Sequence, residues 1–267
     1  MTVRVPAASC RVALRLAYDG SGFSGWQRQP GRPTVQGEVE RAVARLYGLP
    51  PGAVPVQGAG RTDAGVHALA QVAAFAPPAA RPLAELARGL ARLLPSAVRL
   101  TGIAEMPADF HPRRDAALKE YRYRIAHGRV VLPFEAPWTW GIRDRLDVAA
   151  MRSAAEGLVG RRDFAAVAAA GGAARGTVRT LHRLEAIERG EGSLEIVAAA
   201  DGFLYRMVRN LVGLLVAVGT GRLGPDEAAA RVAGGDRRAL PPPAPARGLA
   251  LAEVRYDPPV DWKAVPP

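Results

Sequence analysis

The sequence predicts an α+β fold, in which mostly antiparallel strands form a sheet covered by helices. Residues 11–17 and 120–126 alternate apolar and polar side chains, as in a strand with one buried face. Residues 34–46 and 82–94 repeat apolar side chains every three to four positions, the spacing of a helix with one buried stripe. The order strand, helix, strand, helix occurs twice, so we predict two similar halves.

The first half has clear start and stop signals. In the predicted strand from Arg11 to Ala17, Val12, Leu14 and Leu16 face one side. The strand ends in a predicted turn over residues 18–22, because glycine tolerates a positive φ and aspartate caps its own turn. The other predicted elements are a helix over 34–46, a strand around 54–57, a strand over 71–75 and a helix over 82–94 flanked by Pro82 and Pro95.

The second half begins with the strictly alternating residues 121–125 and a turn at His127-Gly128. Asp147 is a predicted N-cap for the next helix. We place an N-terminal α+β domain at residues 1–110 and a C-terminal α+β domain at residues 111–267. The remaining predicted elements are strands over 178–188, 193–199 and 248–256, a helix over 204–219 and a short helix after Pro225.

The charge balance indicates a polyanionic partner. Lys and Arg number 36 against 25 acidic residues, a formal net charge of +11. Such an excess favours nucleic acid ahead of a membrane surface. A GC-biased genome would explain why Lys119 and Lys263 are the only lysines, but it does not explain why basic residues outnumber acidic ones.

Cysteine content and hydropathy predict a soluble, cytoplasmic protein. Cys10 is the single cysteine, so no intrachain disulfide forms, which fits a reducing compartment. Three arginines interrupt the apolar residues near the N-terminus, where a signal peptide would need an unbroken apolar run. The longest apolar run, residues 211–218, is far shorter than the roughly 20 residues of a membrane span.

The Gly-rich stretch over residues 58–68 is the strongest candidate for chemistry. Its glycines allow tight turns and close approach to a ligand, and Arg61 and Asp63 stand within it. One interpretation is structural: Asp63 caps a helix and Arg61 is its ion-pair partner. The other is functional: Asp63 is a nucleophile or base that a neighbouring arginine keeps ionised. His67 is interpreted as structural, since no zinc-type spacing of histidine and cysteine occurs.

Five segments resemble one family. "GRTDAGVHA" resembles the catalytic motif of the tRNA pseudouridine synthase A family. The other resemblances are carried, in family order, by "YDGSGFSGWQRQ" (18–29), "FHPRRDA" (110–116) with "KEYRYRI", "FLYRMVRNLVG" (203–213) and "ARGLALAEVRY" (246–256).

The resemblance implies an enzyme, an isomerase that converts uridine to pseudouridine at positions 38 to 40 of the tRNA anticodon arm. It implies that no cofactor or metal takes part. It also implies a homodimer, with two α+β halves flanking a central basic active-site cleft. Glycosidic cleavage builds oxocarbenium charge, which a carboxylate stabilises.

By matching motif positions, the resemblance assigns three catalytic residues: Asp63 as nucleophile, Tyr121 stacking on the base and handling the C5 proton, and Arg209 as the ion-pair partner of Asp63. Whether Asp63 attacks C1′ or acts otherwise stays open. Alternation puts Tyr121 and Tyr123 on one strand face, so periodicity alone does not separate an active-site tyrosine from a core one. Arg206, Arg209 and Asn210, the only asparagine, are predicted to share one helix face.

The remaining predicted contacts are with tRNA. Arg61 fills the space left by the flipped base, and Leu249 packs on that base. Trp26 and Phe23 either stack on nucleotides or lie in the core. Residues 165–176, almost all Ala and Gly, are predicted to form a mobile loop, which leaves Arg175 as its tRNA contact. Further substrate contacts, mostly with phosphates, are expected from Arg28, Arg81, Phe110, His111, Arg113, Arg114, Arg129 and Arg175.

Two other functions fit part of the pattern. A non-catalytic RNA-binding protein would keep the basic surface but lose the catalytic loop, whereas Asp63, Tyr121 and Arg209 are all present. A metal-dependent nuclease needs clustered carboxylates, and no acidic pair lies near Asp63 in the sequence.

Overall fold

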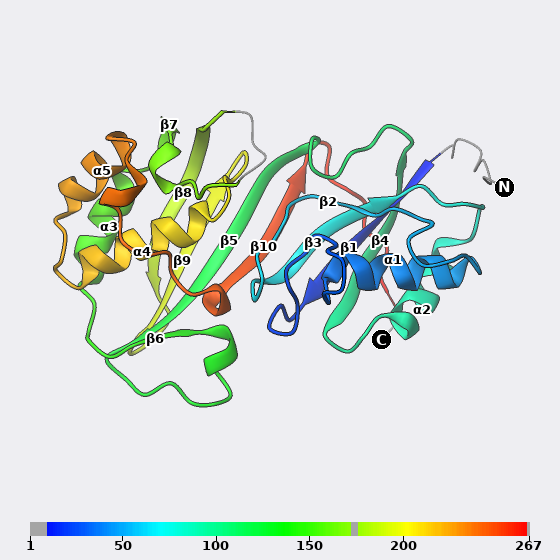
Figure 1. Ribbon diagram of the computed structural model, residues 1–267, viewed down its shortest axis with the longest axis horizontal. Coiled ribbons are helices and arrows are strands. Elements are labelled where there is room, and N and C mark those ends of the chain that lie inside the picture. Colours follow the sequence, from blue (N-terminus) through cyan, green and yellow to red (C-terminus); the bar gives the residue numbers. More distant parts are fainter. Residues whose placement is uncertain (1–9, 172–175, 266–267) are drawn as a thin grey trace. The chain divides into compact units, whose positions relative to one another are not determined.

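The computed structural model describes residues 10–171 and 176–265 and confirms the α+β class, with helices set against mostly antiparallel strands (Figure 1). The chain separates into two compact units. The first comprises residues 1–117 and 251–267, and the second comprises residues 118–250. The division into domains at residue 110 stays a prediction. None of the helices within the described residues is long and apolar enough to cross a membrane.

The first unit is built around a central strand, β1 (Cys10–Tyr18). Its Leu14 lies opposite Ala73 and Ile103 on the two neighbouring antiparallel strands, and all three are fully buried. Helices α1 (Val35–Leu46) and α2 (Leu83–Leu93) contribute apolar faces to the same core. The strand order is β4 (Val98–Pro107), β1, β3 (His67–Phe75), β10 (Leu249–Tyr256), with the short β2 (Gln57–Gly58) paired to β3.

The second unit is built around a buried helix, α4 (Met207–Gly219), of which every residue except Arg209 is buried. Figure 1 shows α3 (Val148–Glu156), α4 and α5 (Pro225–Ala233) together on one face of the strands of this unit. The strand order is β5 (Ala116–His127), β9 (Ser193–Ala200), β8 (Val178–Glu188), β7 (Gly160–Asp163), with β6 (Trp140–Ile142) parallel to β5. Short 3-10 turns lie at η1 (Ala136–Trp138), η2 (Ala165–Val167), η3 (Arg237–Ala239) and η4 (Ala246–Gly248).

Local sequence signals account for several element boundaries. Asp147 caps α3, as predicted, by accepting the N–H of Ala150 at 2.9 Å. Thr34, which was not predicted as a cap, caps α1 by accepting the N–H of Gly37. The predicted turn after β1 also forms, since the Asp19 carboxylate accepts the N–H of Ser21 at 2.9 Å.

The structure differs from the predicted local structure in several places. The strand β4 was missed, because Gly102 interrupts its alternation and its pairing with β1 shifts register between Arg15 and Leu16. The strand β3 begins four residues before the predicted position 71, and β2 is confined to Gln57–Gly58. The helix α4 begins at Met207 rather than near Leu204, because Arg206 is left-handed with φ 58°.

A further difference concerns the start of the Ala- and Gly-rich segment over residues 165–176. It begins with the 3-10 turn η2, and Ala166 and Val167 are fully buried. The amide of Asn210 donates to the Val167 carbonyl at 2.7 Å, which holds this turn against α4. Small side chains therefore pack at residues 166 and 167, whereas the mobile loop predicted for the rest of the segment stays a prediction. Residues 172–175 lie outside the described residues.

Candidate active site

The loop that carries Asp63 connects β2 to β3 and ends in a turn. The N–H of Val66 donates to the Asp63 carbonyl at 3.1 Å, and β3 begins at His67. Asp63 therefore caps no helix. Arg61 is exposed and, within the described residues, forms no hydrogen bond or ion pair, so it is not the ion-pair partner of Asp63. The structural interpretation of the loop fails on both points.

The residue before Asp63 is fixed in the core. Thr62 is 5% exposed, its carbonyl accepts the N–H of Trp26 at 3.0 Å, and its hydroxyl lies 2.8 Å from that of Tyr18. Burial raises the pKa of Tyr18 to about 12, so its hydroxyl stays neutral at physiological pH. Because Thr62 is held by both its backbone and its side chain, the backbone of Asp63 is placed within narrow limits.

Further hydrogen bonds hold the loop on either side. The fully buried Gln71 of β3 donates to the Gly60 carbonyl at 2.9 Å. The carbonyl of its neighbour Val72 accepts the N–H of Ala59 at 2.7 Å. The N–H of Gly65 donates to the Phe23 carbonyl at 3.3 Å. Residues 59 to 65 are thus tied to β3 and to the loop after β1.

Glycines allow the loop after β1 to approach the Asp63 loop closely. A Cβ on Gly20 would lie 2.0 Å from the Val66 carbonyl oxygen. A Cβ on Gly25, which has a φ of +93°, would lie 2.6 Å from the carbonyl oxygen of Thr62. Gly20 and Gly25 of "YDGSGFSGW" are therefore required by contact with the Asp63 loop.

His67 and Trp26 are structural. The buried His67 accepts the N–H of Gly20 through Nδ1 at 3.0 Å, as expected for a structural histidine. Trp26 is 2% exposed and lies 6.3 Å from the Tyr18 ring. Across the described parts of the chain, no three His, Cys, Asp or Glu side chains are placed to hold a metal ion.

Tyr121 and Tyr123 have different surroundings in the structure, although the alternation of the strand did not separate them. Tyr123 is fully buried, and its hydroxyl donates to the Pro245 carbonyl at 2.8 Å. Burial raises its pKa well above the ordinary value. Tyr121 is 7% exposed and makes an edge-on contact with Phe203 at 5.1 Å between ring centres. The environment of Tyr123 is that of a core tyrosine.

Arg209 is the single residue of α4 that is not buried. Its Nε donates to the Ala244 carbonyl at 2.7 Å, and its own carbonyl accepts the N–H of Ala244 at 2.9 Å. The adjacent Asn210 is 1% exposed, and its side-chain carbonyl accepts a hydrogen bond from Arg237 at 3.0 Å. The common face predicted for Arg206, Arg209 and Asn210 does not form, because Arg206 precedes the helix and Asn210 points into the core.

The comparisons with known proteins assign the family. The family model described as tRNA pseudouridine synthase matches residues 16–114 and 154–257. The tRNA pseudouridine synthase A of Syntrophotalea carbinolica is 44% identical over 247 residues, covering 92% of this chain and 96% of the relative. The chain belongs to the tRNA pseudouridine synthase family. The protein of the same name from Solidesulfovibrio magneticus is 46% identical over 256 residues, covering 93% of this chain and 92% of that protein.

Membership in the tRNA pseudouridine synthase family confirms the resemblance seen in the five segments. The family isomerises uridine to pseudouridine in tRNA, so this chain is an isomerase. The roles of individual residues are a separate matter, and they stay predictions.

The "FHPRRDA" segment of this pseudouridine synthase presents two exposed arginines on a fixed turn. His111 Nδ1 accepts the N–H groups of Arg113 and Arg114 at 3.2 and 3.3 Å. Burial and the Arg114 guanidinium lower the pKa of His111 below its ordinary 6.5, which keeps the imidazole neutral at pH 7. Phe110 is 6% exposed and packs on Tyr256, with ring centres 5.3 Å apart. His111 and Phe110 thus shape the turn that presents the arginines.

The other predicted contacts of the synthase differ in their surroundings. Leu249, the first residue of β10, is 5% exposed. Arg175 lies outside the described residues. Three predicted phosphate contacts already have partners: Arg28 with Glu40 at 3.4 Å, Arg81 over the Tyr47 ring at 5.3 Å, and Arg129 with Glu135 at 2.9 Å.

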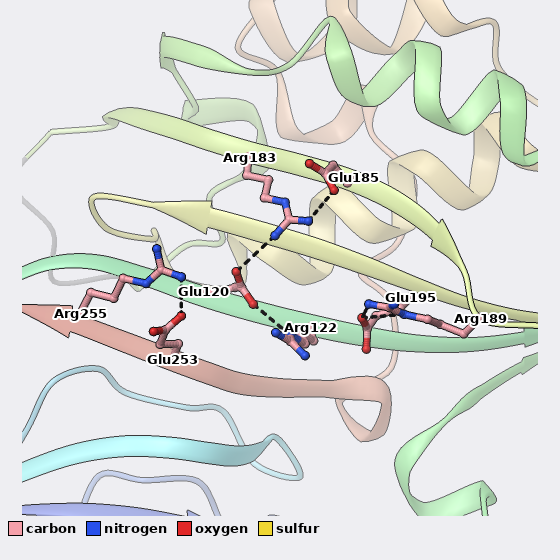
Figure 2. A network of polar contacts seen from close by, with 8 residues as sticks. All are labelled: Glu120, Arg122, Arg183, Glu185, Arg189, Glu195, Glu253 and Arg255. Carbon is pink, nitrogen blue, oxygen red and sulfur yellow. Dashed lines mark hydrogen bonds and ion pairs between the residues drawn. The ribbon is translucent and has the colours of Figure 1, made fainter. Parts of the chain in front are cut away.

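Several arginines of the synthase form ion pairs with glutamates on the face of β5 opposite to Tyr121. Figure 2 shows Glu120 between Arg122 at 2.9 Å and Arg183 at 3.6 Å. Arg189, directly after β8, donates to Glu195 of β9 at 2.6 Å. The net charge of +11 therefore does not locate the RNA-binding surface, because part of the basic charge is neutralised within the sheet.

Sequence reasoning missed the residues that hold the Asp63 loop, namely Tyr18, Thr62 and Gln71. Thr62 lies in "GRTDAGVHA" and Tyr18 in "YDGSGFSGWQRQ", and this position within the motifs could have identified both residues. Gln71, a polar residue among the apolar side chains of residues 68–75, was the second signal.

The close approach of Gly20 to Val66 generates the first prediction. Gly20→Ala should lower the free energy of unfolding by roughly 2 kcal/mol or more, because a backbone carbonyl cannot move away from the new methyl group. Gly22→Ala is the control, since nothing lies within 4 Å of its added Cβ. Urea unfolding of both variants tests this, and equal midpoints would contradict the contact.

The environments of the two tyrosines generate the second prediction. Tyr123→Phe should keep turnover near wild type and lower the free energy of unfolding by about 1 kcal/mol, because it loses one buried hydrogen bond. Tyr121→Phe should slow turnover by roughly 10²-fold, because the hydroxyl that handles a proton is lost. Equal effects of the two substitutions on turnover would refute the assignment of Tyr121.

Proposed function

We propose that this protein converts uridine to pseudouridine at positions 38, 39 and 40 in the anticodon stem and loop of tRNAs. The observation that carries the proposal is the Asp63 loop, in which Thr62 and Gly60 are held by buried hydrogen bonds and Asp63 is half-buried. A carboxylate held in this way reacts without first paying the entropy of ordering its loop.

The reaction is an isomerisation, so its atoms balance without a co-reactant. The bond between C1′ and N1 breaks, the freed uracil turns, and C5 bonds to C1′. C5 then loses its proton to a base, and N1 gains one. Asp63 stabilises the positive charge that develops at C1′. Because no electrons are transferred to another molecule, we propose that no cofactor takes part.

Three residues complete the proposed chemistry. Tyr121 stacks on the target base and accepts the C5 proton. Arg209 keeps Asp63 ionised, because a nearby positive charge favours the carboxylate. Leu249 packs on the base.

Access to the uridine requires base flipping, since chemistry on a stacked base is sterically blocked. Arg61 fills the space that the base leaves. Its exposure and the absence of an internal partner within the described residues support this role. The guanidinium also provides hydrogen-bond donors for the phosphates beside the flipped nucleotide.

Phosphates of the anticodon arm bind to arginines around the site. Arg113 and Arg114 are exposed beside the neutral His111. We propose Arg28, Arg81, Arg129 and Arg175 as additional contacts, and a homodimer in the cytoplasm as the working form. Arg28, Arg81 and Arg129 would exchange or share their present partners on binding.

The most informative experiment maps pseudouridine in bulk tRNA incubated with and without the protein. The proposal expects new pseudouridine at positions 38 to 40 and nowhere else. A protein that binds RNA without catalysing a reaction would leave the tRNA unchanged, and a nuclease would shorten it.

The proposed nucleophile generates the third prediction. Asp63→Asn should lower turnover by about 10³-fold or more, because the amide cannot replace the carboxylate. Affinity for tRNA should stay within a few-fold, because phosphate contacts dominate binding. The control is Asp109→Asn, an exposed carboxylate of the same unit, which should behave as wild type. Pseudouridine formation by Asp63→Asn at a rate near wild type would exclude Asp63 as nucleophile.

A further inference from the structure

Phe203 contacts the tyrosine for which a catalytic role is proposed. It is half-buried and lies in the short segment between β9 and α4. Its ring meets that of Tyr121 edge-on, with the ring centres 5.1 Å apart and the ring planes at 88° to each other. Aromatic rings favour this arrangement, because the positive edge of one ring faces the negative face of the other. The contact is therefore an attractive one with a defined geometry.

The neighbouring strand β9 gives the ring of Tyr121 little lateral support. Tyr121 lies directly opposite Ala198, and the next residue of β9 on the same face, towards the end of the strand, is Ala200. Directly opposed side chains provide the main lateral contacts within a sheet. At both of these positions β9 offers only a methyl group to a large aromatic ring.

Tyr123, on the same face of β5, has a different environment. It lies opposite the branched Ile196 of β9, and its hydroxyl donates to the Pro245 carbonyl at 2.8 Å. The ladder and a hydrogen bond thus hold Tyr123. For Tyr121, a large side chain comes from Phe203, three residues beyond the end of β9.

The backbone on either side of Phe203 is anchored. The two carboxylate oxygens of Asp201 accept the N–H of Thr180 at 3.2 and 3.1 Å. The Tyr205 carbonyl accepts the N–H of Ala169 at 2.9 Å. Phe203 lies between these two attachments, two residues from each, so its ring is a firm support for Tyr121.

The position of the Tyr121 ring decides where its hydroxyl lies. A group that accepts a proton must come within hydrogen-bonding distance of that proton. The hydroxyl is at the far end of the ring, so a rotation about the Cα–Cβ bond of Tyr121 moves it further than any other heavy atom of the side chain. A ring packed edge-on against Tyr121 opposes this rotation.

We propose that Phe203 positions Tyr121 for catalysis, by holding its ring so that the hydroxyl reaches the C5 proton of the target uracil. This inference rests on the proposed function, since it takes Tyr121 as the residue that accepts this proton. Phe203 is a positioning residue, because it acts through Tyr121. Replacing it should slow the chemical step and leave the affinity for tRNA almost unchanged.

The test measures single-turnover rates and affinities with one anticodon stem-loop. Phe203→Leu should lower the rate at saturating stem-loop roughly tenfold, with affinity within about twofold of wild type, because the hydroxyl is placed less precisely. Phe203→Tyr keeps the ring and should react at the wild-type rate. Phe203→Met also removes the ring and is measured beside Phe203→Leu, so that one such variant remains if the other does not fold.

The control is Phe164→Leu, the same substitution at a fully buried phenylalanine of the same unit. It should lower the urea midpoint, because it leaves a cavity, but the folded protein should react at the wild-type rate. A rate for both Phe203→Leu and Phe203→Met equal to that of Phe164→Leu would overturn the proposal.

A double-mutant cycle separates positioning from general damage to the fold. In the Tyr121→Phe background the hydroxyl is already lost, so Phe203→Leu should lower the rate by less than about twofold. A fall as large as in the wild-type background would overturn the proposal. Pseudouridine formation by the wild-type protein on the same stem-loop is scored separately. Its absence would refute the proposed function and with it the role of Phe203, whereas the other contrary outcomes would refute the role of Phe203 alone.

Discussion

The position of the candidate nucleophile depends on a buried hydrogen bond between Tyr18 and Thr62. The two hydroxyls lie 2.8 Å apart in the core of the first unit, and Asp63 is the next residue along the chain. Gln71 holds Gly60 from β3, and Gly20 and Gly25 remove the side chains that would push the loops apart. A loop of small residues, which would be flexible alone, becomes a rigid support because its neighbours provide the hydrogen bonds.

The same principle explains the second unit. Helix α4 is buried on almost every side, so Arg209 is presented from a helix that has little freedom to move. Tyr123 is held by the Pro245 carbonyl, and its core position leaves Tyr121 as the tyrosine of β5 that the proposed chemistry uses. In both units, buried hydrogen bonds fix the residues for which a chemical role is proposed.

Much of the fold was predictable from the sequence, because strands with one buried face and amphipathic helices have distinct periods. The missed features lack such a period. Strand β4 contains Gly102 and a register shift, and the start of α4 depends on the left-handed Arg206, which no propensity favours. The family was recognisable from its motifs. The separation of Tyr121 from Tyr123 was not, because both lie on one strand face and only their long-range partners differ.

The most direct test of the central claim is the single-turnover rate of Thr62→Val with a saturating anticodon stem-loop. Valine keeps the shape of threonine but loses the hydrogen bond to Tyr18. The account predicts a rate at least about tenfold lower with affinity retained, because Asp63 is less precisely positioned. Thr101→Val, which removes an exposed hydroxyl bonded to Arg15 in the same unit, should react at the wild-type rate. A Thr62→Val rate equal to that of Thr101→Val would contradict the claim that this buried hydrogen bond positions the nucleophile.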